Sequence, residues 1–410
     1  MAVAAAAATL RVHVSVSRVA VAACMHLANL CIEVQNRQLA AGADAVEAIV
    51  AAMQAHPQVA GVQQQGCAAL ANVCCGTDAA GLARKQRATE AGAIEAVAAA
   101  LQAHPQVAEV QQQGCVALVN VCSGMDGAGL ARKQRAAGAG AIEAVVAAMQ
   151  AHPQVAGLQE HGCGALTNVC CGTHAAGFAR NQRAADAGAI EAAVAAMRAH
   201  PQVARVQQQG CAALVNVCSG MDGAGLARKQ RAAEAGAIEA VVAAMQAHPQ
   251  VAGVQQQGCV ALVNVCSGMD GAGLARKQRA AAAGAIEAVV AAMQAHPQMA
   301  GVQEDGCGAL ANVCSGDDAA GRARRQRAAD AGAIEAVVAA MRAHPQVEDV
   351  QKMGCWALRN VCYGNDAAAR ARRQRAVTAH APEAATAALQ AHPENAAVQG
   401  QGQQLRDLLV

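Results

Sequence analysis

The sequence predicts an all-α solenoid, a fold in which tandem repeats of short helices stack into an array. Three observations support this prediction. One Asn recurs at a constant step of 48 residues, from Asn72 to Asn360. Each period contains three segments with helical spacing of apolar residues, separated by Gly-rich or His-Pro breaks. Hydrophobic residues make up 54% of the 410 residues but aromatic residues only 1%, so small aliphatic side chains and Cys are expected to form the core.

Residues 207–254 show how one repeat is organised. Residues 207–218 complete one helix, and the Gly-rich segment 219–225 breaks it. A short basic helix is predicted over 226–235 and a second helix over 237–248. The second helix ends there because Pro249 disfavours a helical residue before it. Pro249 is expected in the first turn of the next helix, which we call the third helix of the repeat.

The third helix has two distinct faces. In the copy at 251–268, Val254, Leu262 and Val265 share one face, which we expect to be buried. Val260 and Asn264 lie on the opposite face, which we expect to be displayed. The recurring Asn is therefore predicted to form a ladder along one side of the array.

Both ends of the chain depart from the repeat. Residues 1–31 are predicted to be an N-terminal partial repeat with the third helix alone, because Cys24 to Cys31 matches the Cys, Leu, Asn and Cys of a full copy. A short disordered start before that helix is left open. The first 20 residues lack acidic side chains and also resemble an organelle transit peptide in composition. Residues 32–366 form the repeat array, and 367–410 are predicted to be a partial C-terminal capping repeat, since polarity rises there.

The repeat resembles the armadillo repeat. The run from Lys229 to Ile238 resembles that family's passage from the first helix to the second, and Gln-Gly-Cys-x-Ala-Leu-x-Asn resembles its third helix. The resemblance covers about residues 12–410. The 48-residue length is closest to the armadillo region of large leucine-rich-repeat kinases. The resemblance implies a right-handed superhelix whose third helices line a groove for protein partners.

The groove-facing residues are the first candidate site. The Asn side chains could hold the backbone of an extended peptide through paired donor and acceptor contacts, or each Asn could brace the adjacent helix end. The ladder comprises Asn72, Asn120, Asn168, Asn216, Asn264, Asn312 and Asn360.

The copy at 351–363 has the strongest recognition chemistry. Relatives place Trp four residues before the Asn, but here that position is Ala, Val or Gly until Trp356. Helical spacing puts Lys352, Trp356, Arg359 and Asn360 on one side of the helix. Trp and Arg often anchor interfaces, so specificity is predicted to concentrate here. The alternative is that Trp356 covers the core beside the capping repeat.

A basic motif in the first helix is the second candidate site. Stacked copies of Arg-Lys-Gln-Arg would form a ridge able to meet nucleic acid, acidic proteins or an anionic membrane surface. Nucleic acid is disfavoured because aromatic stacking residues are missing. The other interpretation is a solvated face balanced by Glu. The ridge comprises Arg84, Lys85, Arg87, Arg228, Lys229, Arg231, Arg324, Arg325, Arg327, Arg372, Arg373 and Arg375.

The remaining patterns favour structural roles. The 18 Cys are interpreted as free, buried thiols, because pairs such as Cys67 and Cys74 lack zinc-ligand spacing. The Asp before each basic helix, for example Asp222, is predicted to cap it. No metal site, cofactor or catalytic motif is expected, nor a transmembrane segment.

These patterns favour a function without catalysis. The chain is predicted to be a protein-protein interaction scaffold that binds a partner or extended peptide along the third-helix groove. The alternative is an anion-binding platform on the basic ridge. Free thiols favour the cytoplasm, with the nucleus or an organelle also possible.

Overall fold

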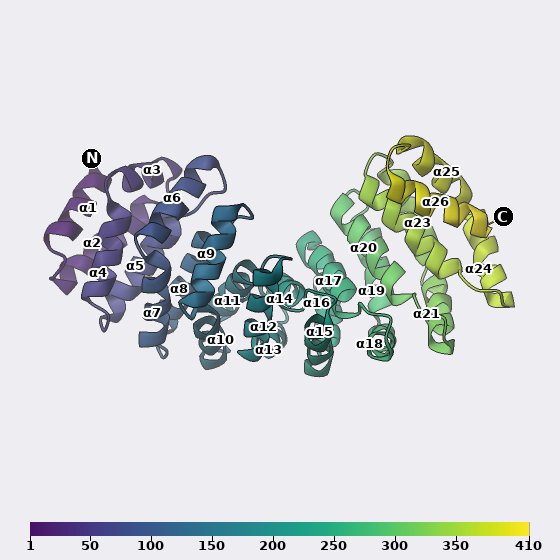
Figure 1. The fold of residues 1–410 in the computed structure, drawn as a ribbon, viewed down its shortest axis with the longest axis horizontal. Coiled ribbons are helices and arrows are strands. Elements are labelled where there is room, and N and C mark those ends of the chain that lie inside the picture. The colour runs from purple at the N-terminus through teal and green to yellow at the C-terminus, as the bar shows by residue number, and fades with distance from the viewer. Residues whose placement is uncertain (410) are drawn as a thin grey trace. The chain divides into compact units, whose positions relative to one another are not determined.

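A computed structural model describes residues 1–409, and every regular element in them is an α-helix (Figure 1). The order of the helices follows the predicted three-helix period. The first helices of the repeats are α3 Val34–Gly42, α6 Ala79–Glu90, α9 Gly127–Gly138, α12 Ala175–Asp186, α15 Gly223–Ala235, α18 Gly271–Ala282, α21 Ala319–Asp330 and α24 Ala367–Thr378.

The second helices are mostly apolar. They are α1 Ala2–Val12, α4 Ala45–Ala55, α7 Ala93–Ala103, α10 Ala141–Ala151, α13 Ala189–Ala199, α16 Ala237–Ala247, α19 Ala285–Ala295, α22 Ala333–Ala343 and α25 Ala381–Ala391. The third helices are α2 Ser17–Leu30, α5 Ala60–Val73, α8 Ala108–Val121, α11 Ala156–Val169, α14 Ala204–Val217, α17 Ala252–Val265, α20 Ala300–Val313, α23 Glu348–Cys362 and α26 Ala396–Leu409.

The helices form two compact units, residues 1–200 and a second that starts at Pro201. Within each unit, the third helices of successive repeats pack side by side. These are α2, α5, α8 and α11 in the first unit, and α14, α17, α20, α23 and α26 in the second (Figure 1). The predicted faces are confirmed, because Val254, Leu262 and Val265 are buried whereas Val260 and Asn264 are partly exposed.

Buried polar side chains tie the helix ends together. Gln255 donates from Nε2 to the carbonyls of Met245 and His248, at 2.9 and 2.8 Å, and so satisfies the end of α16. Nε2 of His296 lies 2.8 Å from the carbonyl of Pro249 in the preceding repeat. The His residues of the His-Pro breaks therefore form a row of hydrogen bonds between neighbouring repeats.

The first helix α15 begins earlier than the sequence predicted. The predicted start of α15 was residue 226, but the helix begins at Gly223. The reason is the Asp cap, because Asp222 accepts a hydrogen bond from the Gly225 backbone nitrogen and satisfies one orphan donor. The predicted caps at Asp78, Asp126, Asp222, Asp270, Asp318 and Asp366 are all confirmed.

Two neighbouring glycines of α18 should respond oppositely to Ala. A Cβ on Gly271 would meet nothing within 4 Å, so Gly271→Ala should raise the free energy of unfolding by roughly 0.5–1 kcal/mol by restricting the unfolded chain. A Cβ on Gly273 would lie 2.5 Å from the Gly268 carbonyl oxygen, so Gly273→Ala should lower it by roughly 1–3 kcal/mol. Urea unfolding followed by circular dichroism measures both changes. Changes of the same sign would contradict this account.

The structure corrects both predicted ends. Residues 2–12 form α1, a second helix that buries Val3, Ala6, Ala7 and Leu10, so the N-terminal partial repeat is not a third helix alone after a disordered start. At the other end, α24, α25 and α26 make a complete three-helix repeat rather than a partial one. Its sequence diverges from the other copies, but its apolar positions still have helical spacing. None of the helices within residues 1–409 combines the length and apolar character needed to cross a membrane.

Candidate functional site

The ladder Asn side chains bridge neighbouring third helices. Nδ2 of Asn264 donates to the carbonyl of Val215 in the preceding third helix at 2.9 Å, and Asn360 donates in the same way to Ala311 at 2.7 Å. Asn72, Asn120, Asn168 and Asn312 make equivalent bonds. Asn216 donates to Ala212 of its own helix at 3.2 Å. The carbonyls that accept across neighbouring third helices lie in the last turn of the preceding helix, where no backbone donor is available.

These bonds agree with the bracing interpretation of the ladder. The side-chain amide nitrogen of each bridging Asn donates one hydrogen bond in this way, and most of these side chains remain partly exposed. Asn312 is the most enclosed, with 7% of its surface exposed. A role for the ladder in holding a peptide backbone stays a prediction.

The predicted basic ridge needs a correction, because most of its side chains are buried. Arg84, Lys85, Arg228, Lys229, Arg324, Arg325 and Arg372 are each at most 5% exposed. Arg87, Arg231 and Arg373 are partly exposed, and Arg327 and Arg375 are exposed. The sequence shows where positive charge falls along a helix but not the backbone carbonyls that it faces.

The buried Arg caps the third helix that precedes it. Nε of Arg276 donates to the Val265 carbonyl at 2.8 Å, and its Nη2 donates to the Ser267 carbonyl at 2.7 Å. Its Nη1 reaches Gln230 of the preceding repeat at 3.1 Å. A positive charge at a helix C-terminus also interacts favourably with the helix dipole. The motif therefore stabilises the fold instead of presenting a continuous charged surface.

The buried Lys joins successive repeats. Lys229 donates to the Gly220 carbonyl at 2.6 Å and to Ser267 Oγ of the next repeat at 2.7 Å. Burial lowers the pKa of Lys229 to about 8, because desolvation disfavours the charged amine. The last Arg of the motif pairs with a Glu of the preceding repeat, as Arg279 does with Glu239 at 2.6 Å. Such pairs are partly solvated, so they add little to affinity or stability.

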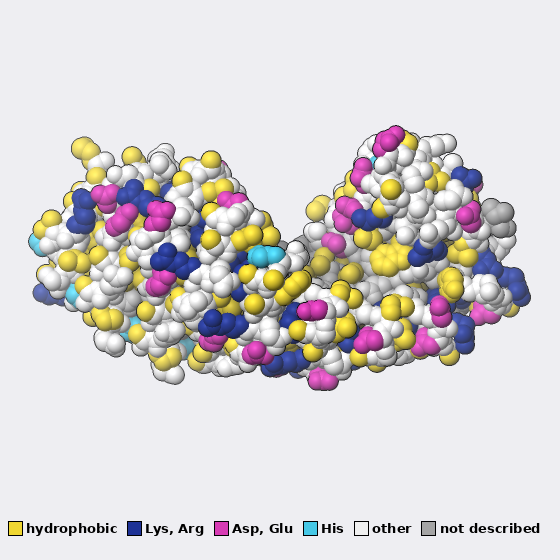
Figure 2. Space-filling view, in the orientation of Figure 1, with side chains coloured by type: hydrophobic (Ala, Val, Ile, Leu, Met, Phe, Trp, Pro, Cys, Tyr) yellow, Lys and Arg dark blue, Asp and Glu magenta, His cyan; other side chains and the backbone are white. Residues whose placement is uncertain are grey.

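The second unit contains a cleft of about 810 Å³ at the predicted recognition copy. From α23 and its end come Trp356, Arg359, Asn360 and Tyr363. Three of these residues, Trp356, Arg359 and Asn360, belong to the cluster predicted from the sequence, and Tyr363 does not. On this face of the second unit, Figure 2 shows hydrophobic side chains beside Lys or Arg in a hollow.

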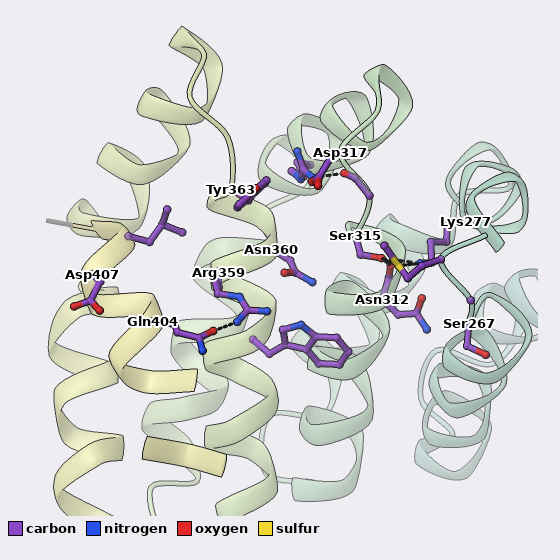
Figure 3. A pocket seen from close by; sticks show the side chains of 16 residues that line it. Ser267, Lys277, Asn312, Ser315, Asp317, Arg359, Asn360, Tyr363, Gln404 and Asp407 are labelled. Atoms are coloured by element: carbon purple, nitrogen blue, oxygen red, sulfur yellow. Dashed lines mark hydrogen bonds and ion pairs between the residues drawn. The ribbon is translucent and has the colours of Figure 1, made fainter. Parts of the chain in front are cut away.

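Neighbouring repeats complete the cleft. Lys277, Asn312 and Ser315 lie on one side, whereas Gln404 and Asp407 of α26 lie on the other (Figure 3). Of these five residues, only Asn312 belongs to the site predicted from the sequence. One signal was present, because Ser267, Ser315 and Tyr363 occupy one position at the 48-residue step.

Lys352 does not join the cleft. The predicted helical side was broad enough to include it, but it lies two turns from Asn360 and forms an ion pair with Asp349. Lys352 is therefore the one member of the predicted cluster that does not line the cleft.

The three cationic side chains of the cleft differ in the groups that they contact. Arg325 lies 5.0 Å from the Tyr363 ring centroid, as in a cation–π contact, and pairs with Asp317 at 3.3 Å. Lys277 donates to Ser315 Oγ at 2.8 Å. Arg359 donates to the neutral amide of Gln404 (Figure 3). Among these cations, Arg359 is the most accessible, because Lys277 and Arg325 are buried.

The Cys side chains are free thiols, as predicted, and all but Cys75 and Cys171 are buried. Burial raises the pKa of Cys74 to about 12, so the thiol stays protonated and packs as a small apolar group. Residues 1–409 contain no group of three or more His, Cys, Asp or Glu side chains placed to hold a metal ion.

Asp305 on α20 should make stability depend on pH. Burial, aided by the charge of Glu304, raises its pKa from 3.8 to about 6, although a hydrogen bond from Gln256 opposes the shift. The unfolded chain therefore loses this proton first, and the contribution of Asp305 to stability falls as pH rises from about 4 to 6. Asp305→Asn should raise the free energy of unfolding at pH 7 by about 1–2 kcal/mol, after allowance for solvent screening. Urea unfolding should show no gain below pH 4, and an equal gain at both pH values would refute the prediction.

Comparisons with known proteins agree with the fold. No protein-family model matches the sequence, and no curated protein matches it. One similar solved structure comes from a study of a conserved phosphorylation switch that controls the interaction between cadherin and beta-catenin in vitro and in vivo. It superposes with a TM-score of 0.53 and 14% identity, over 99% of this chain and 83% of that chain. At this identity the likeness shows the fold alone: an all-α, armadillo-like solenoid with three helices in each 48-residue repeat.

Proposed function

We propose that this protein is a non-enzymatic scaffold that binds a partner protein or extended peptide along the third-helix groove. The cleft at Trp356 is the observation that carries this proposal, and we place the main contact there. It brings together the single Trp of the chain, the accessible Arg359, and the polar groups of Asn360 and Tyr363.

The chemistry of the cleft suits a peptide. Trp356 offers a large, partly exposed apolar surface, and burying such a surface is a frequent source of binding energy. Arg359 could exchange its neutral Gln404 partner for a peptide carbonyl or a carboxylate, and a charge-assisted bond is stronger than a neutral one. Asn312 and Asn360 retain amide atoms that can meet an extended backbone.

We also propose a family relationship and a compartment for this scaffold. The repeat length supports a relationship to the armadillo region of large leucine-rich-repeat kinases. The free thiols support a reducing compartment, with the cytoplasm proposed first and the nucleus or an organelle as alternatives. The armadillo-like fold of a structure from the cadherin and beta-catenin study supports a protein partner.

Co-purification from native cells, followed by cross-linking and mass spectrometry, tests the proposal. The native chain should recover a partner cross-linked near the cleft, and Trp356→Ala should lose it. Met221→Ala is a matched control, because Met221 occupies the position of the cleft residue Met269 one repeat earlier and lies outside the cleft. Equal recovery by all three forms would exclude the cleft as the main contact.

A further inference from the structure

Three methionines at one repeat position are unusually exposed. Met125, Met221 and Met269 show 61%, 61% and 64% of their surface to solvent. Methionines of the second helices, such as Met245 and Met293, are 2% exposed. The methionines at these two repeat positions therefore differ sharply in their access to solutes.

Met269 differs from the other two because it lines the cleft. Its Sδ lies 3.1 Å from Nζ of Lys277, which also donates to Ser315 Oγ at 2.8 Å. Met221 has the same relation to Lys229, at 3.1 Å. The thioethers of Met221 and Met269 each lie beside an ammonium group that links two repeats.

We infer that Met269 is a reversible oxidation site that changes the polarity of the cleft. The oxidant is a hydroperoxide. A sulfur lone pair forms the S–O bond as the peroxide O–O bond breaks, and the departing oxygen takes a proton to leave as water or an alcohol. The sulfur loses two electrons and the peroxide gains them, so the products are the sulfoxide and water or the alcohol.

The groups around Met269 determine how its oxidation changes the cleft. A sulfoxide oxygen is a much stronger hydrogen-bond acceptor than a thioether. Lys277 lies close enough to donate to it, in competition with Ser315. The apolar edge that Met269 gives the cleft becomes polar, which disfavours burial against an apolar partner. Release of a partner is the expected outcome, and only this last step rests on the proposed function.

Graded exposure of the full chain to hydrogen peroxide, followed by peptide mass spectrometry, tests the site. Met269 should form sulfoxide at least about tenfold faster than Met293 of the same repeat, since reaction follows exposure. Methionine sulfoxide reductases for both sulfoxide epimers should return it to Met. Equal rates, or an oxidation that the reductases do not reverse, would overturn the inference.

Trp356 emission tests the effect on the cleft without any partner. It is the only Trp in the chain, so its fluorescence reports on this cleft alone. Peroxide should shift the emission of the native chain and of Met221→Leu to longer wavelength, and reduction should reverse the shift. Met269→Leu should not respond. The proposed change in cleft polarity would be overturned if the native emission did not shift when Met269 is completely oxidised. It would also be overturned if the emission of Met269→Leu shifted as much as that of the native chain. Both arms are read without a partner, so they can fail independently of the proposed function.

Discussion

Arg276→Met should lower the free energy of unfolding by roughly 3 kcal/mol, because it removes three hydrogen bonds and leaves the end of α17 without its side-chain cap. The Val265 carbonyl and the Ser267 carbonyl would both lose their guanidinium donor, and the Met side chain can replace neither bond. Arg276 is 2% exposed, so water has little access to those carbonyls. Circular dichroism during urea unfolding measures the loss.

Arg279→Met is the matched control, because it lies three residues later in the same motif. Its side chain is 42% exposed and pairs with Glu239 on the surface. Loss of such a pair should cost less than about 1 kcal/mol. Equal losses for Arg276→Met and Arg279→Met would contradict the distinction between a buried cap and a surface pair.

The repeats themselves were predictable from the sequence because their signals are local. Helical spacing of Val254, Leu262 and Val265 identified the buried face, and Asp222 identified a helix start. The start of α15 was still misplaced, because Gly223 to Gly225 resembled a loop. Gly225 does not mark a loop, because it lies inside the helix. A Cβ there would lie 2.6 Å from the Gly220 carbonyl carbon, so only Gly fits at this close approach of two backbone segments.

The role of the basic motif was not predictable from charge alone. Arg276 binds backbone carbonyls. Every residue has a backbone carbonyl, so no residue type in the sequence marks the partner of this Arg. The cleft was partly predictable, because Trp356, Arg359 and Asn360 lie on one helix and share a face. Its other walls come from α18, α20, α21 and α26 and from the loops before α18 and α21, and only tertiary packing brings Lys277 and Gln404 into one cleft with Arg359.

Trp356→Ala should weaken binding of the co-purified partner about 30-fold to 1000-fold, which corresponds to roughly 2–4 kcal/mol for an anchor residue. The reason is that the cleft has one Trp, and no other aromatic side chain except Tyr363 lines it. Isothermal titration with the purified partner measures the change. Trp356→Phe should recover part of the affinity, because a smaller aromatic ring still fills some of the cleft.

Arg359→Ala provides the second side of a double-mutant cycle. If Trp356 and Arg359 contact one segment of the partner, the loss of binding free energy in the double variant should differ from the sum of the two single losses by at least about 0.5 kcal/mol.

Met221→Ala should leave the affinity within about twofold, since Met221 lies outside the cleft. Thermal melting must show that Trp356→Ala keeps the fold, because α23 also packs against α20 and α26. A folded Trp356→Ala variant with native affinity would show that Trp356 covers the terminal core and that the partner binds elsewhere on the array.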